Sequence, residues 1–243
     1  MKFTYVKESK VGLKRSNNED AIGIYEVDGG LLTIVCDGLG GNNAGEIASS
    51  LSVEVIYNNF RDSGEQDYLK KIKDSIEAAN KSIKEESSKH DKYDGMATTA
   101  EILFIKEKTA YWGHVGDSRI YNLKNGKLKQ LTKDHSLIQK LIDDGYLTLN
   151  QAETHPNKNI IMRALGDSDS VEIDLSKLKL VPSDDHKFLV CTDGVTNVIN
   201  QNELEKLLNN KDKDNISKNL TSLIEKRGAP DNFSFVLIES CAK

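Results

Sequence analysis

The sequence predicts an α+β domain in which helices pack against antiparallel β-sheets. Two observations support this class: strand-like runs are interrupted by two blocks of helical periodicity, and strands and helices do not alternate in the regular manner of a parallel sheet. Apolar residues make up 37% of the 243 residues and charged residues 29%, a composition typical of folded proteins with one sizeable core. We therefore expect residues 1–243 to form a single domain.

The first half of the chain begins with a predicted hairpin and continues with two helices. Residues 21–27 alternate between apolar and polar side chains, and residues 31–36 form a continuous apolar run. The sequence Asp28-Gly29-Gly30 between them favours a tight turn that tolerates positive φ. Apolar residues recur every three or four positions in 44–60 and again in 68–89, which predicts two amphipathic helices.

The second half predicts a meander, a short helix and a closing group of strands and helices. Residues 136–144 have a helical pattern, and we interpret 137–165, which is polar and mixed in its later part, as a flap. Residues 209–215 (NNKDKDN) are typical of a solvated loop. The predicted strands are 98–106, 109–115, 119–123, 171–180, 187–191 and 232–239, and the predicted helices are 203–208 and 216–226.

Charge and hydropathy exclude several classes of function. Lys plus Arg number 33 and Asp plus Glu number 38, so the net charge of -5 gives no general attraction to nucleic acid or to anionic membranes. No apolar run approaches the roughly 20 residues that a membrane span requires. Cys36, Cys191 and Cys241 are too few and too scattered for a disulfide framework. We expect a cytoplasmic protein that acts as a monomer.

Aspartates recur at places where buried strands begin or end. Asp37 follows TIVC and Asp193 follows FLVC-T, while Asp117 follows another strand and Asp231 precedes the last one. A lone Asp-Gly pair is usually a turn, but carboxylates that converge in a core repel and raise one another's pKa. Divalent cations relieve this repulsion, and ligands that offer oxygen alone favour Mg²⁺ or Mn²⁺ over Zn²⁺.

A longer series of motifs runs in order along the chain from residue 15 to residue 232. The motifs are Arg15-Ser-Asn-Asn-Glu19-Asp20, Asp37-Gly-Leu-Gly-Gly41 with Gly45-Glu46, Thr98-Thr99, Gly116-Asp-Ser-Arg119, Asp134-His135-Ser136, Arg163-Ala-Leu-Gly166, Asp193-Gly194 and Asp231-Asn232. Together they resemble the metal-dependent protein phosphatase family, type 2C, in its bacterial Ser/Thr form. The resemblance implies a four-layer α/β/β/α fold, a central β-sandwich of two antiparallel sheets flanked by helices.

The resemblance also implies the reaction and the metal ligands. The reaction would be hydrolysis of phosphoserine and phosphothreonine in proteins by direct attack of a metal-bridging water. Asp37 would bridge two Mn²⁺ or Mg²⁺ ions, the Gly38 carbonyl would help to hold one, and Asp193 and Asp231 would hold the other. Asp117 resembles the ligand of a third, weaker metal found in bacterial members.

Three further residues match positions near the metals. Glu19 and Asp20 match acids that we expect to act mainly through bound waters, and Arg15 resembles the residue that grips the phosphate. A planar guanidinium suits that role because it can bind two phosphate oxygens at once. Considered singly, Arg15 and Asp117 fit a structural role as ion-pair partners better, and it is the joint order of the motifs that favours the functional role. The implied partners are phosphorylated proteins and a cognate Ser/Thr kinase.

The chain departs from the family pattern where a general acid is expected. Leu39 stands where animal relatives carry a histidine thought to protonate the leaving oxygen, and Asn42 stands where some bacterial relatives have one. We therefore predict a stronger dependence on metal and on the acidity of the leaving group. We assign His114 and His135 structural roles, because neither has a partner at metal-ligand spacing.

The sequence excludes one other phosphatase mechanism and leaves two other functions open. A cysteine-dependent phosphatase is excluded, because Cys36 and Cys191 are followed six positions later by asparagine rather than arginine. The two cysteines are instead expected to be small strand hydrophobes. One alternative is a catalytically weak phosphopeptide-binding or regulatory module of the same fold, and another is an enzyme that acts on a phosphorylated metabolite.

Overall fold

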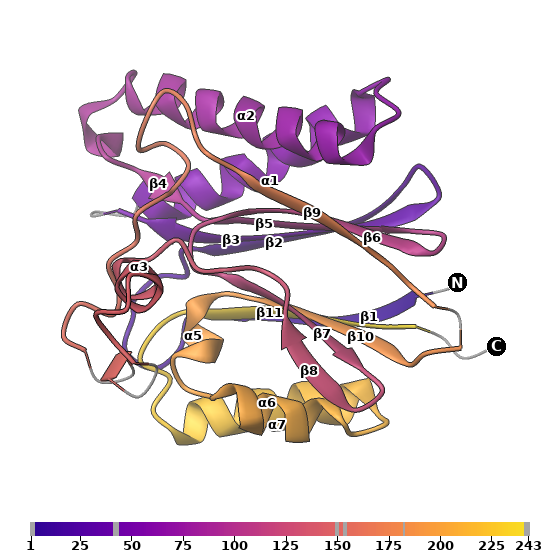
Figure 1. Ribbon diagram of the computed structural model, residues 1–243. Helices are drawn as coiled ribbons and strands as arrows, with labels where there is room; N and C mark the ends of the chain where they lie inside the picture. Colours follow the sequence, from indigo (N-terminus) through magenta and orange to yellow (C-terminus); the bar gives the residue numbers. More distant parts are fainter. Residues whose placement is uncertain (1–2, 41–43, 149–150, 153–154, 182, 241–243) are drawn as a thin grey trace.

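The computed structural model describes residues 3–40, 44–148, 151–152, 155–181 and 183–240. Expectations that concern Gly41, Asn42 and Cys241 lie outside these residues. Two antiparallel sheets lie face to face, with helices on both outer faces (Figure 1). This arrangement confirms the four-layer α+β sandwich that the sequence predicts.

The first sheet has five strands and the second has six. The order of the first sheet is β1 (Phe3–Lys10), β11 (Phe233–Ser240), β10 (His186–Cys191), β7 (Arg119–Lys124) and β8 (Lys127–Gln130). The order of the second is β2 (Asp20–Val27), β3 (Gly30–Leu39), β5 (Ala100–Lys106), β6 (Thr109–Val115) and β9 (Asp174–Lys179), and β4 (Ala97–Thr98) pairs with β3.

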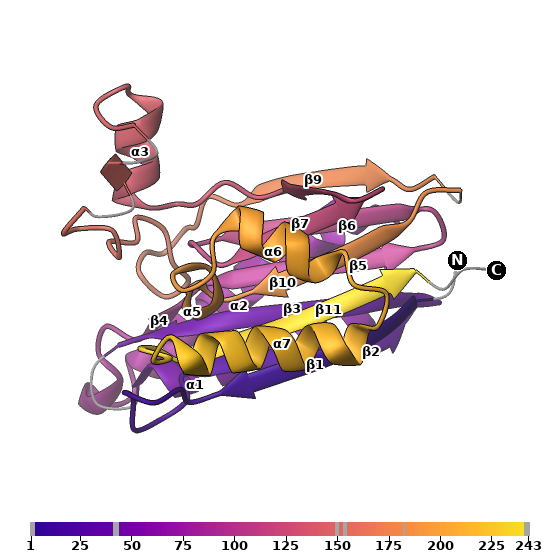
Figure 2. The same cartoon turned by 90° about the horizontal axis from the view of Figure 1, so that it is seen from below.

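Helices cover the outer face of each sheet (Figures 1 and 2). The second sheet is covered by α1 (Ala44–Asp62) and α2 (Tyr68–Ser87), and the first by α6 (Gln201–Leu208) and α7 (Lys213–Lys226). The short elements are η1 (Asp91–Tyr93), α3 (Leu137–Asp143) and α5 (Asp193–Thr196). In the described part of the chain, no helix is both long and apolar enough to cross a membrane.

Local chemistry explains most element boundaries. Asp28 and Gly29 close the β2–β3 hairpin with φ of 53° and 70°, as the Asp-Gly turn predicts. The predicted loop over 209–215 is wrong in its last part, because α7 begins at Lys213. The Asp212 side chain accepts a hydrogen bond from the Asp214 N–H at 2.9 Å and so caps this helix earlier than the apolar pattern indicates.

The core consists of three layers of apolar side chains. The middle layer lies between the sheets, where Val35 and Leu103 of the second sheet pack with Phe188 and Val236 of the first. One outer layer lies under α1 and α2 and the other under α6 and α7. Burial of these layers holds the strands rigidly, so residues at the strand ends keep fixed positions.

The segment interpreted as a flap projects from one end of the sandwich. Figure 2 shows α3 standing away from both sheets, and Ile138 is the buried residue of this helix. The base of the segment is pinned: the Met162 N–H donates to the His135 carbonyl at 2.7 Å, and Thr98 forms a bridge with Leu165. The base of the segment therefore contacts β4, which pairs with the end of β3 next to Asp37.

Candidate active site

Hydrogen bonds between the two sheets join their strand ends. Asp20 opens β2 directly opposite Asp37 on β3. The Thr192 hydroxyl, which follows β10, donates to Asp20 Oδ2 at 3.0 Å, and the Glu19 N–H donates to Asn232 Oδ1 at 2.9 Å. These contacts bring residues from both halves of the chain to one end of the sandwich.

Two glycines allow the backbone segments at this end to approach closely. A Cβ atom at Gly38 would lie 2.2 Å from the Gly45 carbonyl oxygen and 2.5 Å from that of Glu19. A Cβ atom at Gly194 would lie 1.8 Å from the Asn232 carbonyl oxygen. Only glycine fits at either position, so the Asp-Gly pairs serve close packing between segments as well as turning the chain.

The backbone of Asp37 is fixed by two threonines. The Asp37 N–H donates to Thr99 Oγ1 at 2.9 Å, and the Asp37 carbonyl accepts from the Thr98 hydroxyl at 2.8 Å and from the Thr99 N–H at 2.9 Å. Thr99 Oγ1 also lies 2.9 Å from Ser118 Oγ, next to Asp117. The threonine pair thus connects the end of β3 to the turn between β6 and β7.

The carboxyl groups at this end influence one another strongly. Burial raises the pKa of Asp37 well above its ordinary value, and the charges of Asp20, Asp193, Asp117 and Asp231 raise it further. Burial also raises the pKa of Asp20 to about 7 and, with the charge of Asp193, that of Asp117 to about 8. Like charges are thus held together in a desolvated site, the situation that the sequence predicts.

Burial raises the pKa of Asp193, and the charge of Asp231 raises it further, whereas the adjacent Asp37 side chain lowers it. Asn197 donates to Asp193 Oδ2 at 2.9 Å and so orients the Asp193 carboxyl group. Asn197 was not predicted, and its only signal is its place one helical turn after Asp193 in α5.

The donor set fits hard divalent cations. Among the described residues, no three Asp, Glu, His or Cys side chains form a ready-made metal cage. However, Asp20 Oδ1 and Asp117 Oδ1 are buried and have no hydrogen-bond partner in the described part of the chain. Orphaned carboxylate oxygens and mutually raised pKa values are both relieved by cations with oxygen ligands, so the residues fit Mg²⁺ or Mn²⁺.

Arg15 pairs with Asp231 at the rim of the site. The guanidinium places Nε 2.8 Å from Asp231 Oδ1 and Nη2 2.9 Å from Oδ2, a bidentate geometry. The side chain of Arg15 is 51% exposed, so this pair adds little to stability. Burial raises the pKa of the nearby Glu19, whereas the charge of Arg15 lowers it. Arg15 therefore faces the acids named by the sequence and is accessible to a ligand.

The structure brings the predicted side chains to one site. Its members come from both sheets and are Arg15, Glu19, Asp20, Asp37, Asp117, Asp193 and Asp231, with Gly38 next to Asp37 on β3. Sequence reasoning did not single out Thr192, which links the sheets. Its signal is a polar residue between a buried strand and an aspartate.

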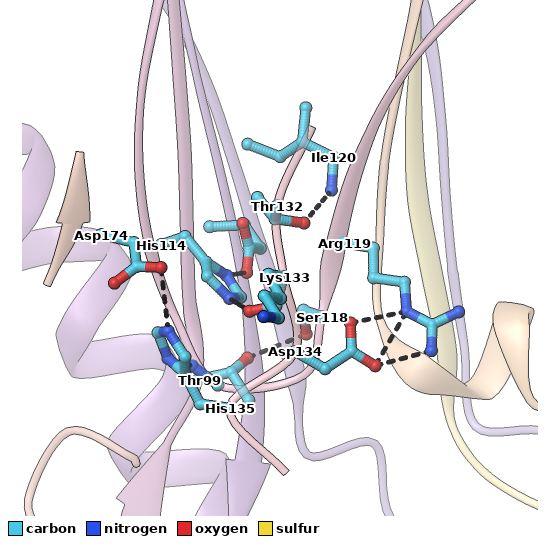
Figure 3. Close-up of polar contacts among 12 residues, drawn as sticks. Thr99, His114, Ser118, Arg119, Ile120, Thr132, Lys133, Asp134, His135 and Asp174 are labelled. Carbon is cyan, nitrogen blue, oxygen red and sulfur yellow. Dashed lines mark hydrogen bonds and ion pairs between the residues drawn. The ribbon is translucent and has the colours of Figure 1, made fainter. Parts of the chain in front are cut away.

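A second polar network lies beside the site (Figure 3). His114 is fully buried, its Nε2–H donates to the Lys133 carbonyl at 2.8 Å, and its Nδ1 contacts Glu101. Burial raises the pKa of Glu101 to about 7, although His114 opposes the increase. Burial lowers the pKa of His114 and Glu101 raises it, with a net increase.

This pair predicts how stability depends on pH. The folded state keeps protons on Glu101 and His114 at pH values where the unfolded chain has lost them. The stability that Glu101 contributes is therefore present at low pH and is lost as the pH rises from about 4.5 to about 7, and the contribution of His114 is lost above about 6.5. In EDTA, the unfolding free energy of the wild type should decrease between pH 5 and pH 7.5. In Glu101→Gln this decrease should be smaller, by on the order of 2 kcal/mol.

Urea unfolding at several pH values measures this effect. Glu77→Gln, on the exposed face of α2 where Glu77 pairs with Lys73, is the matched control and should follow the wild type. Identical pH dependence of the wild type and Glu101→Gln would contradict the prediction.

Comparisons with known proteins agree with this geometry. A profile of the family described as protein phosphatase 2C matches residues 13–231. The serine/threonine phosphatase stp of Listeria monocytogenes serotype 4b is 34% identical over 236 residues, which cover 94% of this chain and 92% of that protein.

Solved structures show the same fold. The serine/threonine phosphatase Stp1 from Staphylococcus aureus has a TM-score of 0.92 and 30% identity, with 99% of this chain and 96% of that chain covered. The catalytic domain of the serine/threonine protein phosphatase PstP, solved with two manganese ions, has a TM-score of 0.87 and 29% identity, with 98% of this chain and 97% of that chain covered.

Proposed function

The chain belongs to the protein phosphatase 2C family and is a metal-dependent protein serine/threonine phosphatase, and from this premise we propose the residues that perform its reaction. Asp37, the Gly38 carbonyl, Asp193 and Asp231 hold two Mn²⁺ or Mg²⁺ ions, and Asp117 helps to hold a third. The observation that carries this proposal is the convergence of buried carboxyl groups from both sheets, whose pKa values are raised by burial and by one another.

The protein residues then have distinct tasks. When bound, the ions lower the pKa of water and neutralise charge on the phosphoryl oxygens. The Asp37 carboxylate would supply negative charge to the ions at the centre of the site, where burial and four neighbouring carboxyl groups raise its pKa. Arg15 leaves or shares its contact with Asp231 to bind two phosphate oxygens of the substrate. Glu19 and Asp20 orient water molecules from the rim and from the base of the site.

The substrates are phosphorylated proteins, and a Ser/Thr kinase that phosphorylates the same proteins is the natural partner. We propose that residues 1–243 act as one catalytic domain, as a monomer in the cytoplasm. The net charge of -5 supports the absence of nucleic-acid partners.

Phosphate release from a phosphothreonine peptide tests the proposed site. The wild type should be stimulated by Mn²⁺ and inhibited by EDTA, and Asp193→Asn should lose this activity. Small phosphate esters measured in parallel separate a protein phosphatase from an enzyme for metabolites. Peptide binding without metal-dependent turnover would favour the phosphopeptide-binding module instead, and full activity of Asp193→Asn would refute the ligand assignment.

Leucine at position 39 predicts that the rate of the chemical step depends on the pKa of the leaving group. Leu39 ends β3 and pairs with Ala97, and it offers no proton to a departing oxygen. Aryl phosphates with less acidic leaving groups should therefore react progressively more slowly in the chemical step, and Leu39→His should weaken this dependence. Equal single-turnover rates for aryl phosphates of widely different leaving-group pKa would show the prediction to be wrong.

A further inference from the structure

Residues 131–135 bind both the start of the turn that carries Asp117 and the strand β7 that follows it. The Leu131 N–H donates to the Ile120 carbonyl at 2.7 Å, and the Ile120 N–H donates to the Thr132 hydroxyl at 3.1 Å. Figure 3 shows Thr132 beside Ile120 and Asp134 beside Arg119. The position of Asp117 therefore depends on the segment that leads into the flap.

His135 makes two hydrogen bonds to a single residue of this turn. Its N–H donates to the Gly116 carbonyl at 2.7 Å, and its ring Nδ1 accepts from the Gly116 N–H at 3.1 Å. Gly116 has φ of 116°, and a Cβ atom there would lie 2.5 Å from Thr99 Cγ2. Because the turn adopts a conformation that glycine alone tolerates, hydrogen bonds to Gly116 determine the direction of the next residue, Asp117.

The hydrogen bond that Nδ1 accepts sets the tautomer of His135. Because Nδ1 accepts a hydrogen bond, the proton of the neutral ring resides on Nε2, which lies 3.3 Å from Asp174 Oδ2. Arg163 Nη1 lies 3.0 Å from Nε2 but cannot donate to a nitrogen that carries a proton, so its N–H is directed to Asp174 Oδ1 at 3.3 Å. The carboxylate of Asp174 thus serves both groups and keeps the lone pair of His135 directed at Gly116.

The surroundings of the ring keep it neutral. Burial lowers the pKa of His135 to about 4, and the nearby His114 and Arg163 lower it further, whereas Asp174 opposes them. The ring of His114 lies with its centre 4.3 Å from that of His135. A neutral ring is required, because a protonated Nδ1 would present a second donor to the Gly116 N–H.

We propose that His135 is a positioning residue that holds the Gly116-Asp117 turn and so aims the Asp117 carboxyl into the metal site. This inference rests on the proposed role of Asp117 as ligand of the third, weaker ion. The orphaned Asp117 Oδ1 is the atom whose direction the turn controls. A ring that merely filled space would need no oriented acceptor at Nδ1.

Two variants of His135 separate the acceptor from the rest of the ring. Asparagine places an amide oxygen near the position of Nδ1 and keeps the bond to the Gly116 N–H. Glutamine places its amide near the position of Nε2 and loses that bond while keeping polar contact with Asp174. Asp117→Asn serves as the reference for loss of the third ion.

Calorimetric titration with Mn²⁺ is the first readout. His135→Gln should bind the weak ion about tenfold more weakly or worse, the range expected when a residue behind a metal ligand is removed. His135→Asn should stay within about threefold of the wild type, and the two tighter ions should be unaffected in both. Equal isotherms for the wild type and His135→Gln, or equal losses in both variants, would overturn the inference.

Nuclear magnetic resonance of the wild type is the second readout and requires no variant to fold. Metal-free, ¹⁵N-labelled protein should show a scalar coupling across the hydrogen bond between the Gly116 nitrogen and His135 Nδ1, together with slow exchange of the Gly116 amide. Both resonances should shift in the weak phase of a Mg²⁺ titration. Absence of the coupling, or resonances that do not move, would refute the role of His135.

The two proposals fail in different ways. If Asp117→Asn binds Mn²⁺ as the wild type does, the proposed third ion site is wrong, and the positioning role fails with it even though the coupling is observed. If Asp117→Asn loses the weak ion while His135→Gln does not, the ion site stands and only the role of His135 is overturned.

Discussion

Asp37→Asn should abolish catalysis and yet stabilise the metal-free protein. The activity on a phosphothreonine peptide in saturating Mn²⁺ should decrease about a thousandfold or more, because a neutral amide would be a much poorer metal ligand than the carboxylate that we propose. The pKa of Asp37 is raised by burial and by four neighbouring carboxyl groups. A neutral side chain at this position removes an unfavourable charge from the folded state.

The sign of the stability change in Asp37→Asn should depend on whether metal is present. In EDTA at pH 7.5, Asp37→Asn should unfold at a higher urea concentration, with a gain on the order of 1–2 kcal/mol. In Mn²⁺ the order should reverse, since the wild type gains stability from the bound ions and the variant does not. Asp169→Asn, whose carboxyl is 97% exposed, is the matched control and should change neither property.

This pair of results distinguishes a functional carboxylate from a structural one. If Asp37 were a structural residue, its replacement would destabilise the protein both in EDTA and in Mn²⁺, because its hydrogen bonds to the fold would be lost. Loss of activity together with loss of stability in EDTA would therefore contradict the assignment of Asp37.

Much of the fold could be predicted because each element has a local pattern. Strand β6 has the predicted bounds of 109–115, since its apolar residues and flanking turns are all encoded within that stretch. β1 was missed for the opposite reason. It is an edge strand with a mostly solvent-facing, charged sequence, and it forms because Phe3–Lys10 pairs with β11 more than 220 residues later.

Short elements escaped prediction because they have too few residues for a period. α5 has four residues and begins at Asp193, so the Asp-Gly pair reads as a turn in the sequence but starts a helix in the structure. The four-residue strand β8 forms as the return of a hairpin with β7.

The convergence of the site could be inferred only through the family resemblance. Local patterns place Asp37 and Asp193 at the ends of buried strands, but nothing in either stretch shows that the two ends meet. Their meeting depends on contacts between sheets, such as that of Thr192 with Asp20, which are separated by 172 residues. The ion pair of Arg15 with Asp231 likewise depends on tertiary packing, and the motif alone indicated a phosphate contact.

Arg15→Ala should act mainly on the binding of substrate. Its guanidinium presents two donors in a fixed plane, and each charge-assisted hydrogen bond to phosphate contributes about 1.5–3 kcal/mol. We expect kcat/KM for a phosphothreonine peptide to decrease about 30- to 100-fold, chiefly through a higher KM. Arg15→Lys should retain the charge but lose the bidentate geometry, with a decrease of about tenfold.

Stability and metal affinity separate this role from that of an ion-pair partner for Asp231. Because the side chains of Arg15 and Asp231 are 51% and 35% exposed, Arg15→Ala should cost less than about 1 kcal/mol in unfolding free energy. Binding of Mn²⁺ should be retained, since the variant leaves Asp231 without a competing partner. Arg61→Ala, which removes an exposed ion pair with Asp62 on α1, is the control and should leave KM unchanged. If Arg15 served only to hold Asp231, Arg15→Ala would instead raise the Mn²⁺ requirement and leave KM for the peptide unaltered, because the phosphate would have lost no contact.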